Sequence, residues 1–214
     1  KKQAAELHDE ILFKQPDSSH EGDCPICCLP ISLDQSKSTM MSCCSKVICE
    51  GCYHSNEVRI TRGSLEWPTC PFCRHPKPKS EDEYEKNVMK RVELNDPIAM
   101  VQMGLRRYET GDYESAFKYV NKAAKLGDAG AHYRMAMFYH EGECVEKDGK
   151  KELYHLEQAA IGGDVTARYN LGGKEFNHDR MDRAMKHWII AAKLGHDDSL
   201  DALKDSYEDG LLSK

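Results

Sequence analysis

The stretch Lys122-Ala-Ala-Lys-Leu-Gly127 recurs twice later in the chain, as Gln158-Ala-Ala-Ile-Gly-Gly163 and as Ile190-Ala-Ala-Lys-Leu-Gly195. If the first unit begins at Asp96, successive units begin 32, 36 and 32 residues apart. A repeat of this length is typical of one helix-turn-helix unit that buries its apolar face by stacking on its neighbours. The spacing therefore predicts about three stacked units, over 96–127, 128–163 and 164–195, and a partial fourth over 196–214.

Small residues recur where stacked helices must approach closely. They are Ala99, Ala131 and Ala167 at one position of the unit, and Gly104, Ala136 and Gly172 at another. Large apolar side chains recur on the second helix of each unit, as Phe117, Leu153 and Met185. This pattern predicts a mainly α chain whose second half is an α-solenoid.

These repeats resemble the Sel-one-like class, which is related to the tetratricopeptide repeats. The signature is carried by Ala131-His-Tyr-Arg-Met-Ala136, by Gly142-Glu-Cys-Val145 and by Arg168-Tyr-Asn-Leu-Gly172, while the first unit is closer to tetratricopeptide spacing. The resemblance implies a curved surface that binds a protein substrate or adaptor. A rigid spacer without a ligand of its own is the alternative.

Cysteines are concentrated in the first half, where nine of the ten lie between Cys24 and Cys73. They include three Cys-x-x-Cys pairs and one adjacent pair: Cys24 and Cys27, Cys49 and Cys52, Cys70 and Cys73, and Cys43 with Cys44. An odd number of cysteines without a secretory context fits a disulfide framework poorly. Eight thiolates are enough for two closed tetrahedral sites, which predicts two structural zinc ions. A single zinc or an iron–sulfur cluster is the alternative.

The cysteine spacing over residues 22–76 resembles a RING finger in an all-cysteine variant. The resemblance implies two cross-braced sites, one formed by Cys24, Cys27, Cys49 and Cys52 and the other by Cys43, Cys44, Cys70 and Cys73. Cys44 stands where most members of that family have a histidine. Cys28, His54 and His75 are therefore reserve ligands.

RING fingers of this kind are ubiquitin ligases that have no catalytic nucleophile and hold a ubiquitin-loaded conjugating enzyme in its reactive conformation. The resemblance implies a contact surface for that enzyme at Ile26 and Pro71, with Trp67 beside it, and Arg74 as the linchpin between the enzyme and ubiquitin. The sequence therefore favours a RING-type ubiquitin-protein ligase or ligase subunit. The alternative is a non-catalytic zinc-binding scaffold for protein–protein interaction.

Helical segments flank the finger. Residues 1–21 hold an N-terminal helix with Leu7 and Ile11 on one face, which we expect to dock on another part of the chain. Residues 77–95 form a linker and a capping helix, in which prolines suit an extended spacer and Ser80-Glu-Asp-Glu83 is a capping box. Asp96-Pro97 predicts the cap and first position of the next helix.

The composition excludes several classes of function. The 214 residues carry 30 basic and 36 acidic side chains, and the acidic excess lies in the second half, which disfavours nucleic acid as a partner. The longest apolar runs are five residues, so no membrane-spanning segment is expected. Residues 1–19 are too polar for a secretion signal, and we expect a cytoplasmic or nuclear location. Cys144 is expected to be a loop or packing thiol.

Overall fold

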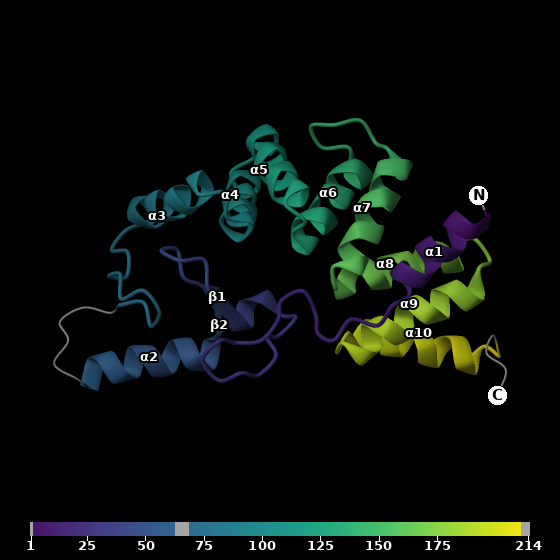
Figure 1. Cartoon of the computed structure of the whole chain (residues 1–214), viewed down its shortest axis with the longest axis horizontal. Helices are drawn as coiled ribbons and strands as arrows, with labels where there is room; N and C mark the ends of the chain where they lie inside the picture. Colours follow the sequence, from purple (N-terminus) through teal and green to yellow (C-terminus); the bar gives the residue numbers. More distant parts are fainter. Residues whose placement is uncertain (1, 63–68, 211–214) are drawn as a thin grey trace. The chain divides into compact units, whose positions relative to one another are not determined.

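The computed structural model describes residues 2–62 and 69–210, which form ten α-helices and one two-stranded sheet (Figure 1). Two compact units are present, one of residues 21–126 and one that joins residues 1–20 to residues 127–214. None of the described helices is long and apolar enough to cross a membrane. The cysteine-rich segment and the first helical repeat therefore share one unit, whereas the N-terminal segment belongs with the later repeats.

The cysteine-rich segment contains very little regular structure. Its elements are the 3-10 turn η1 (Gln35–Lys37), strands β1 (Ser38–Met40) and β2 (Val47–Cys49), and helix α2 (Glu50–Arg62). The strands are antiparallel, with Thr39 opposite Ile48. The buried apolar core consists of Cys24, Ile31 and Ile48, with Tyr53 and Phe72 packed against it. A core this small is below what a domain of this length needs without cross-links.

Three helices complete this unit, α3 (Glu81–Glu93), α4 (Pro97–Glu109) and α5 (Tyr113–Lys125). The predicted caps are confirmed: Ser80 accepts a hydrogen bond from the backbone N–H of Glu83, and Asp96 caps α4 with Pro97 at its first position. The linker after the finger also contacts the finger. Lys77 donates to the hydroxyl of Tyr53 and to Glu57 on α2, so the linker is fastened to the finger.

The second unit contains two stacked helix pairs and a closing helix, seen in Figure 1. The helices are α6 (Ala129–Glu141), α7 (Gly149–Ile161), α8 (Val165–Phe176), α9 (Met181–Lys193) and α10 (Asp197–Glu208). Ala131, Ala136 and Ala167 are fully buried, which confirms close approach at the small-residue positions. The recurring large residue of α7, Leu153, is 40% exposed, and Leu156 is the leucine of this helix that lies in the core.

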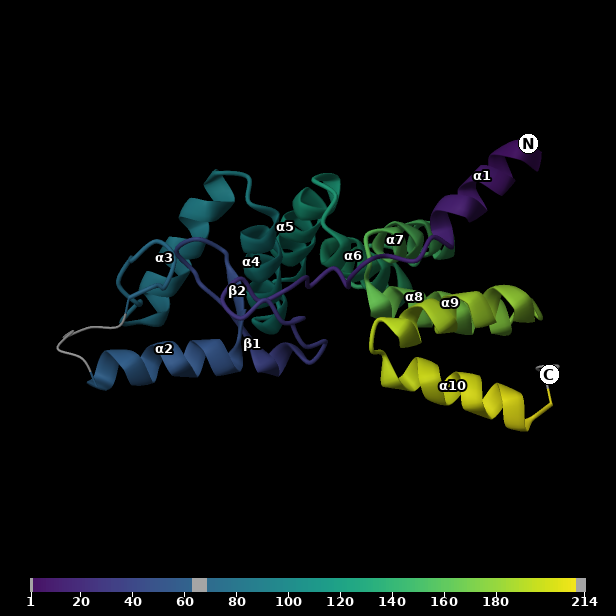
Figure 2. The ribbon, with the colours of Figure 1, turned by 60° about the horizontal axis from the view of Figure 1, so that its bottom comes forward.

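Helix α1 (Lys2–Leu12) docks on these repeats, but by a different face from the one the sequence suggested. Leu7 and Ile11 are 58% and 49% exposed, whereas Leu12 is 1% exposed. Figure 2 shows the N-terminal end of α1 directed away from α9, while its C-terminal end lies beside α7. The contact is therefore made by the last turn of the helix.

Candidate metal centres

The eight cysteines of the four pairs gather into two groups. One contains Cys24, Cys27, Cys49 and Cys52, and the other contains Cys43, Cys44, Cys70 and Cys73. Within each group all four sulfur atoms lie within 4.8 Å of one another. The first pair in the sequence thus joins the third, and the second joins the fourth. This interleaving ties the segments of the finger together at two points.

The first and last cysteine pairs have the same backbone conformation. The N–H of Cys28 donates to the carbonyl of Cys24 at 2.8 Å, and that of Arg74 donates to Cys70 at 3.0 Å. Cys28 and Arg74 both have positive φ, at 57° and 59°. Such a turn directs the two thiols of a Cys-x-x-Cys pair to one point, so each pair forms half of a tetrahedral ligand set.

The sulfur spacing fits zinc. Tetrahedral Zn–S bonds of about 2.3 Å place the sulfurs about 3.8 Å apart. The Sγ atoms of Cys27 and Cys49 are 3.8 Å apart, and those of Cys44 and Cys70 are 3.7 Å apart. Cys43 and Cys73 are closer, at 3.3 Å. Adjacent Cys43 and Cys44 therefore both reach the second group.

The electrostatics of both groups favour a bound cation. Burial raises the pKa of Cys43 and Cys44, and the thiol of Cys70 raises both further. Burial, followed by the thiol of Cys49, raises the pKa of Cys52 to about 12. For Cys24, burial acts upward, but backbone N–H donors outweigh it and lower the pKa to about 6. A divalent metal would allow all four thiols of a group to be ionised together.

The reserve ligands remain outside both groups. In the parts of the chain that the structure describes, neither group includes Cys28 or a histidine. His54 is exposed on α2, and His75 is exposed beside the second group, where it lines a cavity with Cys43 and Cys73. Cys28 occupies the positive-φ position of the first turn, as Arg74 does in the last.

The residues expected to contact a conjugating enzyme are surface groups. Ile26 is 44% exposed, and Pro71 and Arg74 are exposed as well. The position equivalent to Ile26 in the last pair is Phe72, which packs into the core of the finger instead. Trp67 lies outside the described residues. The two turns thus differ at this position, where Phe72 packs inward and Ile26 lies at the surface.

The repeats contain two fully buried polar side chains that the sequence did not assign to a site. Arg168 and His187 are both 0% exposed, although neither has a spacing that marks a ligand or a catalytic group. Burial, followed by the charge of Arg168, lowers the pKa of His187 to about 3. The one signal for Arg168 in the sequence is its place within a repeat signature. Cys144 is exposed in the loop between α6 and α7, as expected.

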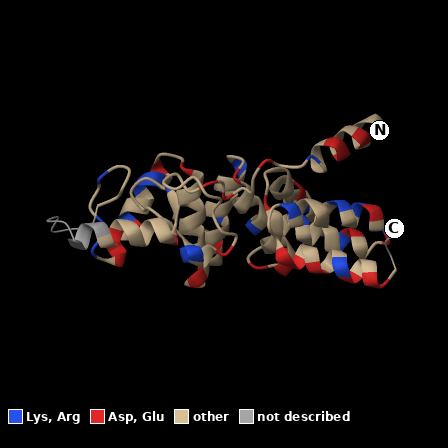
Figure 3. Cartoon of the chain, turned by 90° about the horizontal axis from the view of Figure 1, so that it is seen from below, with Lys and Arg blue, Asp and Glu red and all other residues tan. Residues whose placement is uncertain are grey.

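Charged side chains of both signs follow one another along the helices in the view of Figure 3. This mixture matches the chain's modest net charge of −6.

Comparison with known proteins identifies the helical half. The Sel1 repeat model matches residues 97–128, 129–164 and 166–196. A Sel1 repeat protein from Oxalobacter formigenes has a similar structure, with 30% identity, a TM-score of 0.56, and coverage of 62% of this chain and 57% of that one. No curated protein matches the chain.

A second solved structure agrees on the fold. It is c5321, a protective antigen of uropathogenic Escherichia coli with an SLR fold, with 22% identity, a TM-score of 0.55, and coverage of 62% of this chain and 30% of that one. The chain thus spans 57% and 30% of the lengths of these two structures. The matched region contains three helix pairs, α4 with α5, α6 with α7 and α8 with α9, one for each segment that the Sel1 repeat model matches.

Proposed function

We propose that this chain is a zinc-stabilised scaffold for protein–protein interaction, in which the finger holds two zinc ions and the repeats bind a protein partner. The interleaved groups of four cysteines carry the proposal. Closed four-cysteine sets leave no coordination position for water, so zinc there would be structural. Its contribution would be to cross-link segments that share too small an apolar core. Reduced thiols suit a cytoplasmic or nuclear location.

Native mass spectrometry of the full chain tests the metal assignment. We expect a mass increment of two zinc ions per chain, and tetrahedral thiolate absorption after substitution with cobalt. One zinc or fewer in folded protein would refute the two-site arrangement.

The repeats would supply the partner surface of the scaffold. Stacked helix pairs present a continuous surface whose residues come from several repeats. The zinc content of the finger can be measured without knowing this partner. The two parts of the proposal are therefore separable by experiment.

A second candidate function, that of a RING-type ubiquitin ligase, is favoured by the exposure of Ile26, Pro71 and Arg74 beside cysteine turns. In this function the chain would bind a conjugating enzyme and restrict its thioester-linked ubiquitin to a reactive geometry. The substrate lysine would attack the thioester, and the finger would contribute orientation alone. The planar fork of Arg74 suits simultaneous hydrogen bonds to both proteins.

Discharge of ubiquitin from a broad panel of loaded conjugating enzymes tests this candidate. Acceleration of discharge by the full zinc-bound chain with at least one enzyme of the panel would support the ligase. If discharge is accelerated with none of them, the ligase assignment fails and the scaffold remains.

A further inference from the structure

The last turn of α1 is held in the second unit by an apolar anchor. Leu12 is 1% exposed and lies in a core cluster of the repeats. The residues around it come from α6, α7 and α8, and they are Ala136, Leu156, Ala159, Ala160, Ala167 and Leu171. Four of the six are alanines, and their small side chains leave the space that the leucine occupies. We call this cluster, together with Arg168, Arg183 and His187, the α1 site.

The α1 site also binds the backbone of the segment. The guanidinium of Arg168 donates to the carbonyl oxygens of Leu12 and Lys14, the latter at 3.3 Å. The last carbonyls of a helix have no partner within it and carry a partial negative charge. A fully buried arginine directed at them therefore recognises the end of a helix.

Side chains of α1 make the remaining contacts. Arg183 donates to the carboxylate of Asp9 at 2.5 Å, and Glu175 holds Arg183 in place at 2.9 Å. The Arg183 guanidinium also lies 4.8 Å from the ring centroid of Phe13. The ring of His187 packs against the same phenylalanine, with centroids 4.6 Å apart. Three side chains of the segment thus contact the repeats: Asp9 pairs with Arg183, Leu12 fills the apolar cluster, and Phe13 packs against Arg183 and His187.

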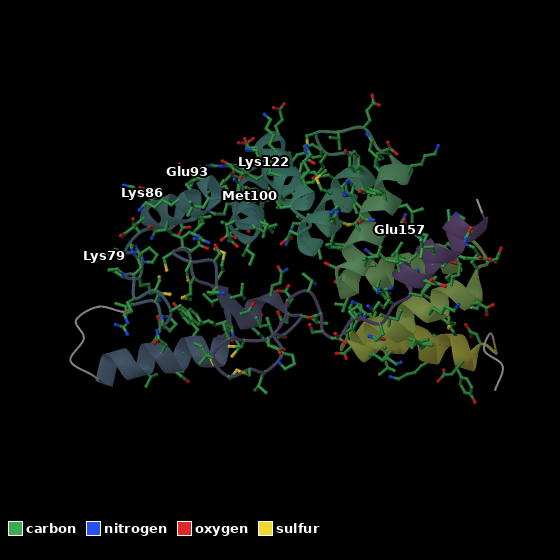
Figure 4. The ribbon with its side chains drawn as sticks, in the orientation of Figure 1. Lys79, Lys86, Glu93, Met100, Lys122 and Glu157 are labelled. Carbon is green, nitrogen blue, oxygen red and sulfur yellow. The ribbon has the colours of Figure 1, made fainter. Side chains whose placement is uncertain are left out.

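The rest of α1 contributes little to the contact. Leu7 and Ile11 are exposed, and the exposed His8 lies 3.4 Å from the carboxylate of Glu157 on α7, which Figure 4 labels near α1. Recognition is therefore concentrated in the pattern Asp-x-x-Leu-Phe at a helix end. A short pattern of this kind can be carried by other proteins.

We propose that the α1 site is a docking site for helix ends of the pattern Asp-x-x-Leu-Phe, which residues 2–14 occupy in cis and a protein partner bearing the same pattern occupies in trans. The inference rests on the proposed role of the repeats as a protein-binding surface. An empty site would expose the alanine-lined cluster and leave Arg168 without its carbonyl partners. Exchange of one helix end for another is therefore favoured over simple release.

A fluorescent peptide of residues 2–20 tests the site on the full zinc-bound chain. In the wild type, the tethered segment competes at a local concentration of about millimolar, so binding of the peptide should be weak. In a Leu12→Ala/Phe13→Ala chain the competitor is weakened, and we expect the peptide to bind at least about tenfold more tightly. Fluorescence anisotropy measures both affinities. Equal affinity for the two chains, or no binding to either, would overturn the proposal.

Two further variants separate recognition from folding. An Asp9→Arg chain loses the pair with Arg183 but keeps the apolar anchor, so it should also bind the peptide more tightly than the wild type does. The same peptide carrying Leu12→Ala and Phe13→Ala should bind no chain. If Asp9→Arg folds normally, as judged by circular dichroism, and its affinity for the peptide is unchanged, the proposal fails.

Light scattering identifies the occupant. The wild-type chain should be a monomer, because its own segment fills its own site. A stable dimer that Leu12→Ala dissociates would assign the site to a second copy of the chain and overturn the assignment to another protein. Zinc content and ubiquitin discharge depend on other residues, so a failure here would leave the assignments of the finger untouched.

Discussion

Gly172 on α8 lies directly against the indole of Trp188 on α9. A Cβ atom added to Gly172 would be 2.2 Å from Nε1 of Trp188 and 2.4 Å from its Cδ1. The same Nε1 donates a hydrogen bond to the carbonyl of Tyr169 at 3.2 Å, which fixes the ring over the glycine. The distance between these two helices therefore depends on the absence of one methyl group.

Gly172→Ala should destabilise the repeats because either the indole or a helix must move. We expect a loss of about 1–3 kcal/mol in the free energy of unfolding, the usual cost of overpacking. Gly173→Ala is the matched control, since a Cβ there meets nothing within 4 Å. That change should stabilise α8 by about 0.5–1 kcal/mol, because alanine is the better helix former. Urea denaturation followed by circular dichroism measures both, and equal stabilities would contradict the packing of α8 on α9.

Features set by nearby residues could be predicted from the sequence. The caps at Ser80 and Asp96, the small residue at position 172, and the repeat boundaries all follow from local spacing. Local spacing also indicates the Cys-x-x-Cys turns, but which pairs share a group was implied by the resemblance to a RING finger and not by local spacing.

Features that join distant parts of the chain could not be predicted. Arg168 and Leu12 are 156 positions apart, and nothing in either sequence context indicates their hydrogen bond. The apolar stripe of Leu7 and Ile11 suggested the wrong face of α1. The actual contact uses Leu12, because Arg168 binds the end of the helix and not its side.

Removal of metal should unfold the finger and spare the later repeats. A strong chelator should increase amide hydrogen exchange over residues 24–62, because the small core of Cys24, Ile31 and Ile48 cannot hold the segment alone. Helices α6 to α9 should keep their protection. Exchange measured by mass spectrometry, with and without zinc, checks this. Unchanged exchange in the finger would show that metal is not needed for its fold.

Single cysteine variants should distinguish the ligands. Cys43→Ser and Cys44→Ser should each lower zinc content to about one ion per chain, because each removes a thiolate from the second group. Cys28→Ser is the matched control and should retain two, since Cys28 lies outside both groups. Elemental analysis of the purified variants gives the answer. If Cys28→Ser lost zinc while Cys43→Ser and Cys44→Ser kept two ions, Cys28 would be a ligand and the adjacent pair would not.

Stability of the repeats should fall with pH below about 6.5, the ordinary pKa of histidine. His187 is fully buried, with its pKa lowered to about 3 by burial and by Arg168, while Glu175 and Asp9 act in the opposite direction. Between pH 6.5 and pH 3 the imidazole of His187 is therefore protonated in the unfolded chain and neutral in the folded chain. The free energy of unfolding falls as the pH is lowered through this range. The slope is about 1.4 kcal/mol per pH unit from this residue.

Urea unfolding between pH 5 and pH 7.5 measures that slope. His155, whose pKa burial and the charge of His132 lower to about 4, should add to it. His187→Leu should therefore reduce the slope without abolishing it. The carboxylates of Asp9 and Glu175 have lowered pKa values and stay ionised over this range. A slope identical to that of the wild type would show that His187 has the same pKa in the folded and the unfolded chain.

Ile26→Ala should weaken a conjugating enzyme's binding without damaging the finger. The side chain is 44% exposed, so its loss costs the fold little, whereas burial in an interface makes it an anchor. We expect a loss of about 2 kcal/mol, or about thirty-fold in affinity. Leu94→Ala is the control, because Leu94 is an exposed apolar residue at the end of α3, 69% exposed. Titration calorimetry with an active conjugating enzyme of the panel should show weaker binding for Ile26→Ala and unchanged binding for Leu94→Ala.

Arg74 should affect the rate of discharge and not the binding of the enzyme, because its proposed role is to fix the geometry between two proteins. Arg74→Lys is the sharpest test. It keeps the positive charge, and the strain of a non-glycine residue at a φ of 59° is the same in both chains. Lysine lacks the planar fork that can bond both proteins at once. We therefore expect slower single-turnover discharge with enzyme affinity and zinc content unchanged. If Arg74→Lys discharges ubiquitin as fast as the wild type does, positive charge alone is sufficient at this position. If Arg74→Lys instead loses as much enzyme affinity as Ile26→Ala does, Arg74 is part of the binding surface.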